Sequence, residues 1–88
     1  MDEWRWLDEL AAALGEPPVD RAQIGVMLRL SREVAHEVER KLAPLSTFVA
    51  GMHVGRRTAE GAAPAEALRE VEEAAARLVP PAAPRPRG

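Results

Sequence analysis

Two histidines and three short hydroxyl residues are the side chains that could serve a metal site or a catalytic site. His36 follows Glu33 by three residues, the spacing that places a carboxylate and an imidazole on one helix face in di-iron bundles. Such a site needs a second copy of the motif and two further carboxylates, whereas His53 has Val49 three residues before it. We therefore predict a surface or boundary position for His36, with no metal or cofactor site.

Ser31, Ser46 and Thr47 provide hydroxyl groups. A hydroxyl nucleophile needs an oriented base and a group that stabilises the developing oxyanion. No pattern in so short a chain supplies a third orienting group or an oxyanion hole. We predict that the protein is not an enzyme.

The composition limits the classes of protein to which the chain can belong. Its 88 residues carry 14 acidic and 12 basic side chains and no cysteine, which describes one small domain without disulfides or a cysteine-based zinc site. No run approaches the roughly 18 apolar residues of a membrane span. The acidic start, Met1-Asp2-Glu3, lacks the basic region of a secretory signal, so we expect a cytoplasmic protein without a membrane segment.

Apolar residues at helical spacing predict a first helix over about residues 2–14, with Gly15 as its stop. The following Glu16-Pro17-Pro18-Val19 predicts an extended break, because proline restricts itself and the residue before it. The two tryptophans lie on different sides of this helix. We expect Trp4 to enter the core and Trp6 to be exposed.

A second helix is predicted over about residues 20–40, opened by a capping box between Asp20 and Gln23. Leu42-Ala43-Pro44 reads as the connector to a third helix over about 45–57, with Ser46 or Thr47 as its cap. The third helix has an expected inner stripe of four large apolar residues, Leu45, Phe48, Val49 and Met52.

Pro64 suits the first position of a fourth helix over about residues 64–79. Its expected inner face consists of Leu68, Val71, Ala75 and Leu78. These elements predict an all-α fold, a small bundle of four helices over residues 1–79, with a disordered tail rich in proline and arginine over 80–88. A core this small supplies only about 3 to 5 kcal/mol, so a partner or a second copy is an expected source of further stability.

Four residues are candidates for a contact with such a partner: Trp6, His36, Arg40 and Pro44. Trp6 is the strongest of them, since an exposed tryptophan often marks an interface. Gly51 and Gly55 have the Gly-x-x-x-Gly spacing, which we interpret as a place of close helix packing inside the domain.

The second and third helices could also be read as a helix-turn-helix, which makes a small DNA-binding regulator the alternative function. A recognition helix beginning Ser46-Thr47-Phe48-Val49 offers few side chains that read bases. The net charge of −2 also opposes binding to phosphates, so a nucleic-acid partner is not favoured.

Several segments together resemble a family of short helical domains from actinobacteria to which no biochemical activity is assigned. The segments are Met1-Asp2-Glu3-Trp4, Leu10-Ala-Ala-Ala-Leu14-Gly15, Arg32-Glu-Val-Ala-His36 and Ala43-Pro44-Leu45-Ser46-Thr47-Phe48-Val49-Ala50-Gly51, within residues 1–78. Members of that family occur alone, or fused to or encoded beside the guanylyltransferase that attaches GMP to molybdopterin. The resemblance therefore implies an accessory, protein-interaction domain whose partner belongs to molybdenum-cofactor biosynthesis. The chain itself lacks the glycine-rich phosphate loop that such a transferase requires.

Overall fold

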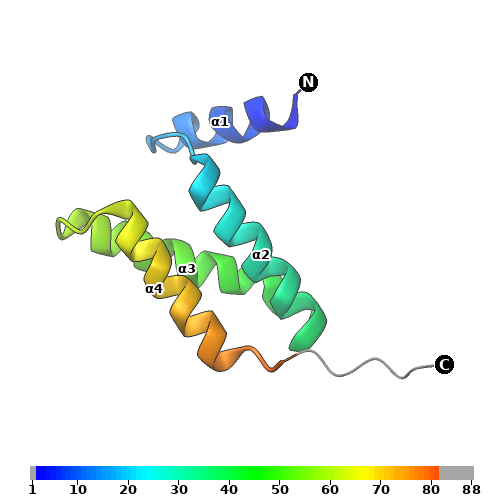
Figure 1. Cartoon of the computed structure of the whole chain (residues 1–88). Helices are drawn as coiled ribbons and strands as arrows, with labels where there is room; N and C mark the ends of the chain where they lie inside the picture. The colour runs from blue at the N-terminus through cyan, green and yellow to red at the C-terminus, as the bar shows by residue number, and fades with distance from the viewer. Residues whose placement is uncertain (1, 82–88) are drawn as a thin grey trace.

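The computed structural model describes residues 2–81, which form four helices and no strand. The helices are α1 (Glu3–Ala13), α2 (Arg21–Glu37), α3 (Leu42–Ala59) and α4 (Pro64–Leu78), as Figure 1 shows. The predicted all-α class and the number of helices are confirmed. The expected disorder of residues 82–88 lies outside the described residues.

The last three helices form the packed body of the molecule. α3 contacts both α2 and α4, and α2 also contacts α4. Their common core consists of small and medium apolar side chains, namely Ala50, Val54, Ala67, Leu68 and Val71, with Val26, Met27 and Leu30 packed against them. By contrast, α1 contacts none of the other helices and projects from the start of α2, clear of α3 and α4 (Figure 1).

Local hydrogen bonds fix the end of α1 and the beginning of α2. The amides of Gly15 and Glu16 donate to the carbonyls of Ala12 and Ala11 at 3.0 and 2.9 Å, which is a Schellman motif with Gly15 at φ 73°. Asp20 and Gln23 form the predicted capping box, with bonds of 2.8 and 2.9 Å. Only residues 17–19 lie between the Schellman motif and the capping box.

The connection between α2 and α3 lies earlier in the chain than expected. α2 ends at Glu37 and α3 begins at Leu42, so residues 38–41 form the connector and Pro44 lies inside the first turn of α3. A proline fits there because the first amides of a helix have no partner within the helix. The expected capping by Ser46 or Thr47 is wrong, since these hydroxyls donate back to the carbonyls of Leu42 and Pro44.

The expected inner stripe of α3 is also wrong. The buried residues of this helix are Ala43, Ala50 and Val54. Small side chains on the inner side let α3 approach α2 and α4 closely, and the large apolar residues consequently remain outside. In α4, Leu68 and Val71 are buried as expected, but Leu78 is 78% exposed.

Trp4 does not enter the core. It is 49% exposed, close to the 54% of Trp6, because no other helix covers α1. Within residues 2–81, no helix combines the length and the apolar character needed to cross a bilayer.

Candidate protein-interaction surfaces

The outer side of α3 is an apolar surface without a covering element in the described chain. It consists of Leu45, Phe48, Val49 and Met52, which are 58%, 68%, 63% and 59% exposed; we call these four residues the α3 face. At about 100° per residue they share one side of the helix, opposite Ala43, Ala50 and Val54. Exposed apolar side chains that gather in one patch mark a contact surface more often than scattered ones do.

A groove of about 650 Å³ runs beside the α3 face, between the C-terminal parts of α2 and α4 and the first half of α3. Its walls include the apolar residues Leu30, Val34, Val38, Leu42, Val49 and Leu78. We call this the α2–α3–α4 groove. An apolar groove bounded by helices is suited to receive the apolar side of another helix.

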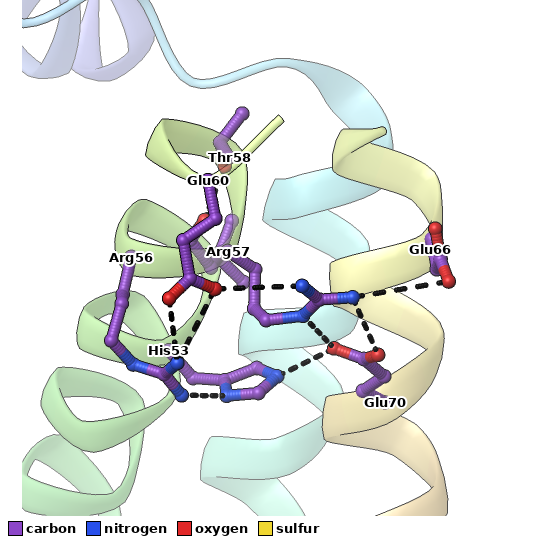
Figure 2. A network of polar contacts seen from close by, with 8 residues as sticks. His53, Arg56, Arg57, Thr58, Glu60, Glu66 and Glu70 are labelled. Carbon is purple, nitrogen blue, oxygen red and sulfur yellow. Dashed lines mark hydrogen bonds and ion pairs between the residues drawn. The ribbon is translucent and has the colours of Figure 1, made fainter. Parts of the chain in front are cut away.

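One end of the groove is closed by a polar network between α3 and α4. Figure 2 shows the Glu70 carboxylate between the Arg57 guanidinium and the His53 imidazole. Arg57 donates to both oxygens of Glu70 at 3.1 and 3.3 Å, and His53 Nε2 lies 2.8 Å from Glu70 Oε1. Arg56 Nη2 approaches the other ring nitrogen of His53 at 3.3 Å, as also drawn in Figure 2.

These contacts keep Glu70 ionised. The hydrogen bonds from Arg57 and from His53 lower the pKa of the Glu70 carboxyl below its ordinary value, against a smaller opposing effect of desolvation. The same carboxylate raises the pKa of Arg57 further. The ionised carboxylate belongs to α4 and accepts hydrogen bonds from two side chains of α3. The network therefore acts as a clamp between α3 and α4.

The four interface candidates do not gather at one site. Trp6 is on α1, away from the body, whereas Arg40 and Pro44 lie at the corner between α2 and α3, where both are exposed. His36 is exposed on α2 and lines a separate hollow against the end of α4. None of the four belongs to the α3 face or lines the groove.

Glu33 and Glu37 line the same hollow as His36. In the part of the chain that the structure describes, no three His, Cys, Asp or Glu side chains lie together as metal ligands would. The surface position predicted for His36 is confirmed.

Gly51 and Gly55 do not serve close packing inside the domain. A Cβ atom added at either position would meet nothing within 4 Å. Both glycines lie on the exposed side of α3, next to Phe48 around the helix, so any close approach there has to come from outside the described chain.

The sequence did contain a signal for the α3 face. Apolar residues occupy almost the whole circumference of the third helix, and a helix in a three-helix body can bury only part of it. The His53–Glu70 contact had no such signal, because its acid comes from another helix, 17 residues later.

The comparisons with known proteins place the chain in a family. The profile of the family described as Domain of unknown function (DUF6457) matches residues 2–85. The chain belongs to this family. No curated protein and no solved structure matches the chain.

The expected kinship with a domain family without an assigned activity is thus confirmed at the level of DUF6457. The actinobacterial origin and the connection with a molybdenum-cofactor enzyme stay predictions.

Proposed function

We propose that this DUF6457 domain is a non-catalytic interaction domain that binds a partner protein in the α2–α3–α4 groove. The observation that carries the proposal is the groove itself, whose apolar walls come from three helices and stand open beside a small core. Binding of a partner that removes this apolar area from water is favourable.

The residues that line the groove indicate the chemistry of its occupant. Its floor is formed by valine and leucine side chains, while Glu73 and Arg77 on α4 and the clamped Glu70 supply charges near its edges. An amphipathic helix satisfies this arrangement, since its apolar side enters the groove and its polar side meets the edge charges. The resemblance to domains that accompany the molybdopterin guanylyltransferase supports a molybdenum-cofactor protein as the owner of that helix.

The test compares capture by the wild type with capture by a groove variant. The double variant Val38→Gln, Leu78→Gln removes two exposed apolar side chains from the groove and is expected to keep the helix content of the wild type, since these residues are 49% and 78% exposed. We expect the immobilised wild type to enrich a molybdenum-cofactor protein from cells of its source, and the variant to lose that enrichment.

Ala65→Gln is the matched control, because it places the same side chain at an exposed position of α4 outside the groove. Equal enrichment by the double variant and the control would contradict the groove as the binding site. Absence of every cofactor-pathway protein from the wild-type sample would contradict the predicted partner.

The alternative, a DNA-binding regulator, gains no support from the outer side of α3. The side chains that a recognition helix would offer to base edges are apolar here. Retention of the wild type on duplex DNA that falls steeply with salt would favour this alternative over the interaction domain.

A further inference from the structure

The described chain has a second uncovered apolar surface, on α1. It consists of Trp4, Trp6, Leu10 and Leu14, which are 49%, 54%, 41% and 67% exposed; we call them the α1 face. At about 100° per residue, the two tryptophans lie about 160° apart around the helix and form the two edges of this face, with Leu10 and Leu14 between them. No other helix contacts α1, so nothing among residues 2–81 outside its own neighbourhood covers this face.

We propose that the α1 face of one copy docks on the α3 face of a second copy, and that the contact is reciprocal, so that two copies form a symmetric dimer. Both surfaces are short stripes along one helix. From Trp4 to Leu14 the α1 face spans about 15 Å, and from Leu45 to Met52 the α3 face spans about 10 Å. The α3 face adjoins the groove and shares Val49 with it, but this inference does not depend on the proposed function.

The charges of the two helices are complementary. Residues 1–16 contain five acidic side chains and one basic side chain, a formal net charge of −4. α3 contains no acidic residue, and it has Lys41 before its first turn and Arg56 four residues after Met52. An acidic helix is therefore attracted to α3 and directed along its apolar side.

The exposed apolar area of the two faces is comparable with that of a standard interface. Each copy offers eight large side chains on the two faces, and at about 100 Å² apiece they approach the roughly 800 Å² that each partner contributes to a standard interface. Gly51 and Gly55 leave a smooth edge beside Phe48, where the backbone of a second helix can approach closely.

The linker directs α1 away from its own α3. The Schellman motif and the capping box set the helix ends on both sides, and Pro17 and Pro18 keep the three residues between them extended. Figure 1 shows α1 clear of α3 in consequence. A second copy meets no such restriction, which favours exchange of α1 between two chains.

The two tryptophans of the protein provide the readout, because both are on the α1 face. The full chain is examined by sedimentation velocity and tryptophan emission at concentrations from about 1 to 100 μM, since dimer formation follows mass action. We expect the wild type to become dimeric over this range, with emission moving to shorter wavelength. Phe48→Glu should remain monomeric with emission at longer wavelength, although circular dichroism shows unchanged helix content.

Thr58→Glu serves as the matched control, because it introduces the same charge at an exposed position of α3 outside the α3 face. It should dimerise like the wild type. A wild type that is monomeric at every concentration overturns the proposal, including the case in which its tryptophans are already buried by docking within one chain.

A mixing experiment separates α1-on-α3 docking from pairing of two α3 faces. Leu10→Glu damages only the α1 face, and it should be monomeric when alone. Mixed with Phe48→Glu, it restores one of the two reciprocal contacts, so a heterodimer should form at the higher concentrations. If the wild type dimerises but the mixture stays monomeric, docking of α1 on α3 is wrong.

Discussion

At the scale of single residues, the polar contacts of this domain concentrate on Glu70. The Glu70 carboxylate accepts hydrogen bonds from Arg57 and His53 of α3, and Arg57 also lies 3.9 Å from Glu66 of α4. Arg29 and Glu72 join α2 to α4 at 3.1 Å, but both side chains are largely exposed and such pairs contribute about 0 to 1 kcal/mol.

The lowered pKa of Glu70 predicts how the stability of the domain depends on pH. A carboxyl whose pKa is lower in the folded protein than in the unfolded chain stabilises the fold above its ordinary pKa, and this contribution is lost as the pH falls through the lowered value. Glu70→Gln should therefore reduce the free energy of unfolding at pH 7, and the difference from the wild type should shrink in strongly acidic solution.

Urea unfolding at a series of pH values measures this difference. Glu72→Gln is the control, since it removes an exposed pair on the same helix and should have a small effect at pH 7. A difference between wild type and Glu70→Gln that stays constant from neutral to acidic pH would show that the ionised carboxylate does not stabilise the fold.

At the scale of the helices, sequence signals within a few residues were sufficient to predict where several helices begin or end. Gly15, the Asp20–Gln23 box and Pro64 each act through the backbone nearby, so they could be recognised without knowledge of the packing. Phe48 and Leu78 could not be placed in this way. Whether an apolar residue on a helix is buried depends on which side the neighbouring helices approach, and Ala43 and Ala50 give α3 a second apolar side.

Two glycines of the helices should respond oppositely to alanine. Gly15→Ala places a side chain at φ 73° and is expected to cost about 1 to 2 kcal/mol. Gly25→Ala lies inside α2 with open space around the new methyl group, and it should stabilise the domain by about 0.5 to 1 kcal/mol.

Helix content measured at increasing temperature shows these changes as shifts of the far-ultraviolet signal. The Gly15 variant should lose the contribution of α1 to the far-ultraviolet signal first, because α1 packs against no other helix. A Gly25 variant less stable than the wild type would mean that α2 has a close neighbour at this position.

At the scale of the whole molecule, stability rests on a few side chains between α2, α3 and α4. Leu68 is the only leucine of the buried core in the described chain, at 4% exposure, and its neighbours are mostly alanine and valine. Leu68→Ala should cost about 2 to 5 kcal/mol, which is comparable to the total that a core of this size provides. Most of the variant should be unfolded at 25 °C.

Leu28→Ala makes the same chemical change on α2 at a residue that is 55% exposed, so it is the matched comparison. Thermal unfolding followed by circular dichroism should show a small shift for Leu28→Ala and no cooperative transition for Leu68→Ala. Equal shifts for the two variants would contradict the small central core described above.

The short tether between α1 and α2 also changes the strength of any contact that α1 makes. Residues 14–20 hold the end of α1 within about 28 Å of the start of α2. A molecule captured by α1 is therefore presented to the three-helix body at an effective concentration in the millimolar range, and two individually weak contacts become a durable one. A single change in the proline pair would alter that avidity while leaving every contacting side chain in place.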